Sequence, residues 1–396
     1  MKTLFVNISY LPTIGGVEVI MHNLAKGLVA KGHGVAVITA NTLDLKSAKL
    51  KKEENIDGVK VRRIKAFQLL PRTNPWLTPK IFSAIANADI VHVFSYHPAF
   101  ITNAAYIAAK IKKLPLVVTP IFHPLNSLPN LRFHQKFWTS LYRKVVGPKI
   151  LRLADAVTAL TKTEADFYRS KSLKNVLVIP EAVPLKTETI RQSGLQGFRK
   201  KFGIGDARII ICVGRIVKYK GLDILVRAFA SSREVLPDAQ LIIVGKDQGY
   251  RQELAEIIRE LSCQDNIVFT GDISNEELYC AYEVADAVVH PSLFEAFCRI
   301  ALEAWSHKKA IIVFDKVGEP VSEETGILVK YGDVEGLAKA IIKLLSDEAL
   351  RQNLGQKGHE QVQKFYNWDK VVSDLEQVYG SLAGKRITSQ DTRESG

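Results

Sequence analysis

The chain has 396 residues, a formal net charge of +13 and an apolar fraction of 47%. That length is too great for one ordinary domain and suits two domains, each able to bury its own core. No apolar run is long enough to cross a bilayer, and the apolar start is too short for a secretory signal, so we expect a cytoplasmic protein. The four cysteines lie far apart, which is typical of reduced core thiols and excludes a disulfide framework or a zinc site: Cys212, Cys263, Cys280 and Cys298.

Positive charge is concentrated in the N-terminal half. Residues 90–154 contain nine lysines and arginines but no aspartate or glutamate. A face of this kind attracts anions, which include nucleotide phosphates, acidic lipid headgroups and nucleic acid. Nucleic acid is disfavoured as a partner because the sequence has no recognition motif and no basic-aromatic sheet module.

Predicted strands and helices alternate along the whole chain. Short runs that are apolar on both faces are typical of parallel strands covered by helices. The alternation predicts two doubly wound, Rossmann-like α/β domains. In chain order, the predicted strands are Thr3–Ile8, Val35–Thr39, Ile90–Phe94, Leu116–Thr119, Ala156–Ala159, Val176–Ile179, Ile209–Val213, Gln240–Val244, Ile267–Thr270, Ala287–His290 and Ala310–Phe314. The predicted helices include Val19–Lys31, Leu222–Arg233, Arg251–Leu261, Asn275–Tyr282, Ile300–His307, Val334–Leu345 and Asp369–Leu382.

The domain boundary is expected within residues 181–197, where prolines and a polar stretch follow the strand that ends at Ile179. We therefore assign residues 1–185 to an N-terminal domain and residues 186–365 to a C-terminal domain. An amphipathic helix within residues 366–384 is expected to return to the first domain and complete it. The polar residues 385–396 are expected to form a disordered tail.

The stretch from Pro291 to Ala304 is the most informative, because it follows a predicted strand and opens a predicted helix. A helix that begins at the carboxyl edge of a parallel sheet directs free backbone N–H groups and its positive dipole end there, where a diphosphate fits. Glu295 would lie beside a reacting sugar, and Glu303 would accept hydrogen bonds from ribose hydroxyls. From the spacing alone, a helix-start carboxylate and a surface carboxylate explain these two residues equally well.

A pair of cations follows the predicted strand Ile209–Val213. Gly214 begins the loop, and Arg215 and Lys220 leave the sheet edge on it. Two such cations can converge on phosphate and neutralise the charge that develops on a departing diphosphate. Taken one at a time, the side chains are better explained as solvated loop cations.

Two features of the N-terminal half point to ligand contact more weakly. Gly15 and Gly16 follow the first strand, as glycines do where backbone must approach a ligand, although a glycine pair is more often only a tight turn. His123 follows the end of a strand and could contact a sugar or handle a proton, although a lone histidine is more often structural.

Together these residues resemble the retaining GT-B glycosyltransferases called family 4, and the likeness extends from Gly15 to about Tyr379. The order and spacing of the matching pieces make the resemblance specific. The pieces are Gly15-Gly16-Val17-Glu18, Lys31-Gly32-His33, Asp89-Ile90-Val91-His92, Arg215 with Lys220-Gly221, Ile243-Val244-Gly245, Phe269-Thr270-Gly271, Pro291-Ser292 with Glu295 and Glu303-Ala304, and Thr325-Gly326-Ile327-Leu328-Val329.

The resemblance implies a GT-B architecture, in which two Rossmann-like domains face each other across a cleft. It implies transfer of a hexose from a UDP- or GDP-linked sugar to a hydroxyl acceptor, with retention and with neither a divalent metal nor another cofactor. Arg215 and Lys220 would bind the donor phosphates, Glu295 would contact the transferred sugar, and His123 completes the catalytic candidates. Further residues are expected at the donor: Gly15, Gly16, Gly214, Phe269, Gly271, Ile273, Ala296, Phe297, Cys298, Arg299 and Glu303.

Several positions depart from the family pattern. Cys298 stands where a glycine usually follows Glu-x-Phe, and we expect its side chain to crowd the sugar or diphosphate while its backbone N–H stays available. Residues 179–184 and 316–320 also differ from the usual turns. A catalytically impaired donor-binding protein is therefore one alternative. A nucleotide-sugar epimerase is another, although its acid and base residues are not recognisable.

The stretch 131–152 mixes aromatic residues and cations without an acid, as interfacial helices do. It predicts contact with an anionic membrane, such as the inner face of the cytoplasmic membrane, and a lipid-linked acceptor. A core-facing helix with a solvated basic side explains the pattern equally well.

Overall fold

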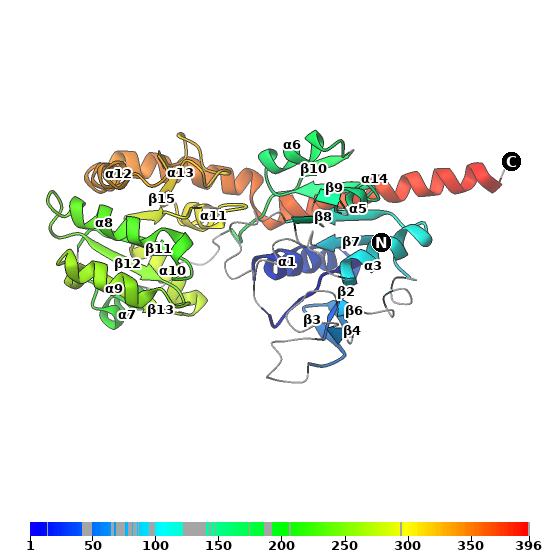
Figure 1. Ribbon diagram of the computed structural model, residues 1–396, viewed down its shortest axis with the longest axis horizontal. Coiled ribbons are helices and arrows are strands. Elements are labelled where there is room, and N and C mark those ends of the chain that lie inside the picture. The colour runs from blue at the N-terminus through cyan, green and yellow to red at the C-terminus, as the bar shows by residue number, and fades with distance from the viewer. Residues whose placement is uncertain are drawn as a thin grey trace. The chain divides into compact units, whose positions relative to one another are not determined.

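The protein divides into two compact units, residues Met1–Glu181 with Trp368–Gly396, and residues Ala182–Asn367 (Figure 1). The computed structural model describes residues 1–394 apart from 14, 42–49, 65–66, 69–75, 78–80, 82–84, 86, 95–99, 122–139, 142–143, 146, 174, 186–191, 206 and 294. His123 and most of the stretch 131–152 lie outside the described residues.

The N-terminal unit contains an eight-stranded sheet in the order β10-β9-β8-β7-β1-β2-β4-β3. All neighbours are parallel except β3 and β4, which pair antiparallel. A separate antiparallel pair joins β5 to β6. The strands are β1 (Lys2–Val6), β2 (Gly34–Ala40), β3 (Glu53–Ile56), β4 (Val59–Ile64), β5 (Phe67–Gln68), β6 (Trp76–Leu77), β7 (Ile90–Phe94), β8 (Leu116–Thr119), β9 (Ala156–Ala159) and β10 (Val176–Val178).

The strands β3 and β4 were not predicted. The prediction relied on runs that are apolar on both faces, but the first four residues of β4 alternate between buried and exposed positions. Alternation of this kind is the mark of a strand with one solvated face, as expected at an antiparallel sheet edge.

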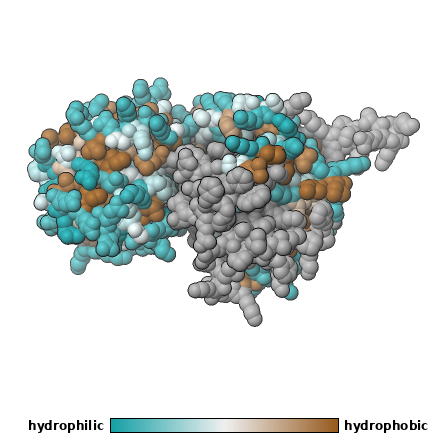
Figure 2. All heavy atoms as spheres, viewed as in Figure 1, coloured by the Kyte–Doolittle hydropathy of each residue, from teal (hydrophilic) through white to brown (hydrophobic). Residues whose placement is uncertain are grey.

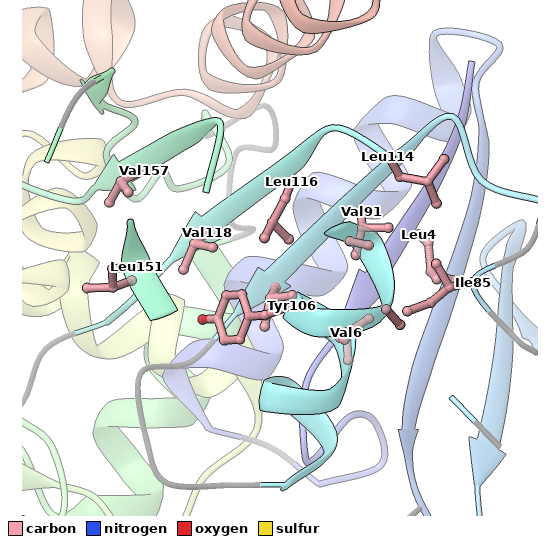
Figure 3. Close-up of a cluster of buried hydrophobic side chains, with 14 of the residues drawn as sticks. Leu4, Val6, Ile85, Val91, Tyr106, Leu114, Leu116, Val118, Leu151 and Val157 are labelled. Atoms are coloured by element: carbon pink, nitrogen blue, oxygen red, sulfur yellow. The ribbon is translucent and has the colours of Figure 1, made fainter. Parts of the chain in front are cut away.

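The core of the N-terminal unit lies between its sheet and the helix α3 (Phe100–Ile111). Figure 3 shows Tyr106 of α3 beside the strand residues Val91, Leu116 and Val118, and each of these four side chains is at most 2% exposed. Burying a side chain of this size contributes about 1.5–3 kcal/mol, so the apolar strands specify the packing. The other described helices of this unit are α1 (Gly16–Ala30), α5 (Gly147–Leu151), α6 (Lys162–Ser170) and α14 (Trp368–Glu394).

The helix α14 brings the end of the chain back onto the N-terminal unit. The Tyr379 hydroxyl lies 2.6 Å from Nδ1 of the buried His92. Against α1, a Cβ added at Gly27 would lie 2.5 Å from Cγ2 of Val372, so the two helices approach closely because Gly27 has no side chain.

The expectation of a disordered tail differs from the structure, because α14 continues to Glu394. Residues 385–394 contain no proline or glycine, so nothing in their backbone chemistry ends the helix there.

The C-terminal unit contains a six-stranded parallel sheet in the order β13-β12-β11-β14-β15-β16. The strands are β11 (Ile209–Val213), β12 (Gln240–Val244), β13 (Ile267–Gly271), β14 (Ala287–His290), β15 (Ala310–Phe314) and β16 (Ile327–Val329). The predicted bounds of β11, β12, β14 and β15 are confirmed. The helical segments are α7 (Gln192–Phe202), η3 (Lys218–Lys220), α8 (Leu222–Ser232), α9 (Arg251–Glu260), η4 (Gln264–Asn266), α10 (Asn275–Val284), α11 (Arg299–Ser306), α12 (Val334–Ser346) and α13 (Glu348–Phe365).

The strand order places a topological switch point between β11 and β14. From β11, the chain continues to β12 on one side, and the later strand β14 lies on the other side. Loops that leave neighbouring strands in opposite directions open a crevice at the carboxyl edge, which is where doubly wound domains bind ligands. The loops after β11 and β14 carry most of the predicted site residues.

Candidate functional site

The loops after β11 and β14 are held against each other by a glycine. Gly221 has a φ of 65°, and a Cβ at that position would lie 2.2 Å from the carbonyl oxygen of Pro291. The backbone N–H of Leu293 donates to the carbonyl oxygen of Tyr219 at 3.0 Å. The two loops therefore behave as one backbone assembly, which brings the side chain of Lys220 to the start of the loop after β14.

Three predicted or neighbouring side chains meet at that point. The Lys220 ammonium forms an ion pair with Oε1 of Glu295, and Nε2 of His290 lies 2.9 Å from the same oxygen. His290 is the last residue of β14 and is 2% exposed, whereas the Glu295 side chain is 20% exposed. The structure thus joins two of the predicted catalytic residues, and it adds a histidine that was not predicted.

The pKa of Glu295 is set by opposing effects. Burial alone would raise the pKa of this carboxyl group. The hydrogen bond and charge of His290, followed by those of Lys220, outweigh burial and lower the pKa to about 2. Glu295 is therefore a fixed anion in the neutral pH range, suited to accepting hydrogen bonds and unsuited to donating a proton.

Arg215 lies on the same loop as Lys220 but is held differently. Its Nη2 donates to the hydroxyl of Tyr219 at 2.6 Å, and its Nη1 donates to Oε1 of Gln248 at 3.3 Å. Gly214 has a φ of 146°, and a Cβ on Gly245 would lie 2.0 Å from the Gly214 carbonyl oxygen. Close backbone packing between β11 and β12 thus fixes where the Arg215 loop begins, while the guanidinium stays near solvent.

The start of α11 corrects one expectation about the diphosphate. The backbone N–H of Cys298 donates to the carbonyl oxygen of Glu319 at 3.2 Å. Contrary to the expectation, this N–H is therefore not free to bind a diphosphate. The backbone N–H of Arg299 is turned back to the carbonyl oxygen of Phe297 at 3.0 Å. The Phe297 ring itself is 7% exposed and packs against Tyr366, with 6.0 Å between ring centroids.

The side chain of Cys298 also lies differently from the expectation that it would crowd the sugar. It is fully buried, and burial raises the pKa of its thiol to about 12. A neutral thiol that is withdrawn into the core leaves the surface of the site to other groups, so the departure from glycine is accommodated by packing.

The carboxylate of Glu303, on α11, accepts hydrogen bonds from two neighbouring side chains. Its Oε2 accepts from the Tyr282 hydroxyl at 2.8 Å, and its Oε1 accepts from Nε of Arg299 at 2.8 Å. Each carboxylate oxygen can accept a second hydrogen bond, so this geometry is compatible with contact to ribose hydroxyls. Arg299 acts here as an orienting partner of Glu303.

The remaining predicted residues of this unit lie in β13, just after β13, or in the loop after β14. The Arg251 guanidinium lies 5.0 Å from the ring centroid of Phe269, a cation–π arrangement. Gly271 has a φ of 71°, which favours glycine at this turn. Ile273 and Ala296 are half-buried.

Gly15 and Gly16, at the start of α1, belong to the N-terminal unit and differ in the space around them. Gly15 is the residue before α1, and a Cβ added to it would lie 2.5 Å from Oε2 of Glu18. Glu18 is 8% exposed and accepts a hydrogen bond from the Ser9 hydroxyl. A Cβ at Gly16 would meet nothing within 4 Å, so only at Gly15 would an added side chain displace a neighbour, the Glu18 carboxylate.

Three residues near the predicted site were missed. His290 carried a usable signal, because a polar residue at the carboxyl end of an apolar parallel strand faces the ligand edge of the sheet. Tyr219 lies between the two predicted cations and could have been chosen on that ground. Gln248 carried no signal, because its contact with Arg215 joins residues 33 positions apart.

Within the part of the chain that the structure describes, no three histidine, cysteine, aspartate or glutamate side chains gather closely enough to hold a metal ion. No helix within the same residues combines the length and apolar character needed to cross a membrane.

Comparison with known proteins gives matches in both units. The family model for glycosyl transferases group 1 matches residues 196–361, and the model for glycosyltransferase family 4 matches residues 14–187. An uncharacterised glycosyltransferase of Methanocaldococcus jannaschii is 27% identical, with 96% of this chain and 98% of the relative covered. A D-inositol 3-phosphate glycosyltransferase of Kineococcus radiotolerans is also 27% identical, with 92% and 90% covered.

The fold is found among solved structures as well. The HepE protein of Anabaena, solved in complex with UDP, superimposes with a TM-score of 0.75 at 20% identity, with 96% of this chain and all of HepE covered. The likeness extends over both units, and it establishes the GT-B fold for them.

Proposed function

Because the chain belongs to the group 1 glycosyltransferases of GT-B fold, we propose that it transfers a hexose from a nucleotide diphosphate sugar to an acceptor hydroxyl, with retention. The observation that carries this proposal is the cluster of Lys220, Glu295 and His290 at the switch point, with Arg215 on the adjoining loop. Two cations and one fixed anion match a ligand whose phosphates are negative and whose sugar offers hydroxyl donors.

In this mechanism, the cations act on the leaving group. Arg215 keeps its hydrogen bond to Tyr219 and exchanges its contact with Gln248 for the donor phosphates, and Lys220 turns its ammonium toward the same group. As the bond between sugar and phosphate breaks, these charges stabilise the departing diphosphate, which makes transfer independent of a divalent metal. The acceptor hydroxyl attacks from the face that the diphosphate leaves, and a phosphate oxygen takes its proton.

Glu295 holds the sugar during this step. Its Oε1 is shared by Lys220 and His290, and within the described residues its Oε2 accepts no hydrogen bond. A carboxylate oxygen open to solvent at the switch point suits a hydroxyl of the transferred sugar. Glu303 accepts hydrogen bonds from the ribose, and the family resemblance adds Gly15 and Gly16 as contacts of the donor.

UDP is the nucleotide that the comparisons favour, since HepE was solved with UDP. GDP is the other candidate. The acceptor of the Kineococcus radiotolerans relative is named as an inositol phosphate, so a phosphorylated polyol is one acceptor class to test beside a lipid.

A second part of the proposal concerns a cytoplasmic protein at an anionic membrane surface. In the described part of the stretch 131–152 and just after it, Val145 is 47% exposed and Leu153 is 37% exposed, and Lys144, Lys149 and Arg152 are exposed around them. The helix α3, whose Lys110 pairs with Asp155 just after that stretch, exposes Ile107 by 48% and Ile111 by 67%. Figure 2 shows hydrophobic surface on the N-terminal unit. Apolar side chains surrounded by cations suit anionic headgroups and a lipid-linked acceptor.

Vesicle sedimentation tests this part separately. We expect the protein to sediment with vesicles that contain anionic phospholipid, and to stay in the supernatant with neutral vesicles or in high salt. Equal sedimentation with both vesicle types would contradict the membrane proposal and would leave the transfer proposal untouched.

The transfer proposal is tested by measuring nucleoside diphosphate released from UDP-glucose and GDP-mannose, with and without added acceptors. Inositol phosphate and vesicles carrying glycolipid serve as acceptors, and Glu295→Gln is the control protein. Release that requires an acceptor and is lost in the variant supports a glycosyltransferase. Sugar interconversion without release would indicate an epimerase, and donor binding without turnover would indicate a catalytically impaired protein.

A further inference from the structure

We propose that His290 is a positioning residue of the donor site, which ties up one oxygen of Glu295 so that the other faces the transferred sugar. This inference rests on the proposed function and deepens it, because it assigns how the sugar contact is held. Its basis is the sharing of a single carboxylate oxygen by two donors.

The geometry around Glu295 is asymmetric. Nε2 of His290 lies 2.9 Å from Oε1, and the Lys220 ammonium contacts the same Oε1. The Glu295 side chain is four-fifths buried, yet its Oε2 has no hydrogen-bond partner among the described residues. An anionic oxygen that has no protein donor and is open to solvent can accept a hydrogen bond from a ligand hydroxyl.

The same three residue types occur a second time in the chain, with the opposite arrangement. On α14, Oε2 of Glu376 accepts a hydrogen bond from the Lys31 ammonium at 2.8 Å, and Oε1 lies 2.7 Å from Nε2 of His33. Both oxygens of Glu376 are therefore occupied by the protein, as suits a contact that docks one helix on another. The comparison shows that a lysine and a histidine can divide a carboxylate between them, and at Glu295 they do not.

His290 is suited to fixing the orientation of the Glu295 carboxylate because its own side chain is confined by burial. It is 2% exposed and belongs to β14, whose four residues are all buried. Lys220, by contrast, lies at the end of the short segment η3, and it must also serve the phosphates in the proposed mechanism. When Lys220 turns to the phosphates, His290 remains as the donor that fixes the direction of Glu295.

Among the described residues, the charged and titratable groups that face Glu295 come from three elements. They are His290 from β14, Lys220 from η3 and the buried thiol of Cys298 at the start of α11. Because that thiol is neutral, loss of the imidazole leaves Lys220 as the remaining support for the charge of Glu295. Burial then favours the protonated carboxyl group, and the sugar contact weakens as the pH falls.

Calorimetric titration with UDP and with UDP-glucose tests the inference, using wild type, His290→Leu, His290→Gln and the matched control His33→Leu. GDP and GDP-mannose replace them if the wild type prefers guanosine. We expect His290→Leu to weaken UDP-glucose binding about tenfold at pH 7.5 while UDP binding changes less than about twofold, since UDP lacks the sugar. We expect the loss to grow as the pH is lowered to 5.5, and His290→Gln, which keeps an N–H donor, to recover most of the affinity.

The control separates a local effect from a loss of structure. His33→Leu breaks an imidazole–carboxylate contact of the same type in the other unit, and it should lower the melting temperature without changing the ratio of the two affinities. Equal weakening of UDP and UDP-glucose in His290→Leu, or an unchanged ratio at both pH values, would overturn the inference. A wild type that binds no nucleotide would overturn the proposed function itself, and the inference with it.

Discussion

The ammonium of Lys220 and the carboxylate of Glu295 form an ion pair although the two residues are 75 positions apart in the chain. The pair exists because the loops after β11 and β14 leave adjacent strands at the switch point of the sheet. Its burial and its position at a ligand edge connect the fold with the proposed chemistry, and they make the following results expected.

Replacement of Glu295 by glutamine should reduce transfer strongly. Glutamine keeps the size of the side chain but removes the negative charge, so hydrogen bonds from the sugar lose their ionic assistance. We expect kcat/KM to fall by about 10- to 1000-fold, the range found when one charged hydrogen-bonding group is removed at a reacting centre. Steady-state release of nucleoside diphosphate measures the effect, and turnover equal to that of the wild type would show that the sugar contact is wrong.

The stability contributed by Glu295 should depend on pH in a defined direction. Its pKa is lowered from 4.5 to about 2 in the folded protein, so its contribution is fully present above about pH 4.5 and is lost as the pH falls toward 2. Urea unfolding of wild type and Glu295→Gln at pH 7, 5.5 and 3 should give a free-energy difference that is constant between the first two and smaller at the third. A difference that stays constant down to pH 3 would show that the carboxyl group is not held as an anion.

Cys298 should be unreactive and catalytically dispensable. All four cysteines are buried, and the raised pKa of the Cys298 thiol keeps it protonated. Intact-mass measurement after iodoacetamide treatment should show no adduct on the native protein and four on the unfolded protein. Cys298→Ala should lose about 1–2 kcal/mol of unfolding free energy through a small cavity, with kcat/KM within about threefold of the wild type. A loss of activity greater than the loss of folded protein would give Cys298 a direct role.

Tyr219 should affect the binding of phosphate through Arg215. Its hydroxyl accepts a hydrogen bond from the guanidinium at 2.6 Å, which Tyr219→Phe removes. We expect UDP affinity to fall by about two- to tenfold, corresponding to the net value of one such hydrogen bond. Tyr331→Phe, at an exposed tyrosine two residues after the end of β16, is the matched control and should bind as the wild type does. Unchanged affinity in Tyr219→Phe would separate Tyr219 from the site.

The docking of α14 should be sensitive to one methyl group. In Gly27→Ala, the new Cβ would meet Val372 at 2.5 Å, so α1 and α14 must separate, and we expect a loss of about 1–2 kcal/mol of unfolding free energy. In Gly380→Ala, the new Cβ meets nothing within 4 Å, and the higher helix propensity of alanine should stabilise the protein by about 0.5–1 kcal/mol. Chemical denaturation measures both, and equal behaviour of the two variants would contradict the close contact.

The sequence was sufficient for the strands that carry the site. Ile209–Val213 and Ala287–His290 are continuous apolar runs, and continuous runs report burial on both faces directly. The ion pair of Lys220 with Glu295 was not predicted, although both residues come after strands that lie side by side in the sheet. The antiparallel pair of β3 and β4 was not predicted, because its half-solvated strands are not continuous apolar runs.

The hydrogen-bond partners and side-chain directions within the site depend on tertiary contacts, which the pattern of residues along the chain does not show. The availability of the Cys298 amide is decided by the Glu319 carbonyl, which comes 21 residues later on another loop. The direction of the Cys298 thiol is decided by packing, and the shared oxygen of Glu295 by the rotamer of His290. Each of these features is a matter of a few ångströms between segments whose proximity only the fold creates.

The most direct test of the central claim is the thermal stability of the purified protein with UDP, GDP and ADP, in wild type and in an Arg215→Ala/Lys220→Ala double variant. A nucleotide at about one hundred times its dissociation constant should add about 2.7 kcal/mol of stability. The account predicts stabilisation of the wild type by one nucleotide above the others, with UDP first, and its loss in the variant. Stabilisation that persists in the variant would place the nucleotide elsewhere, and no stabilisation by any of the three would contradict the donor site.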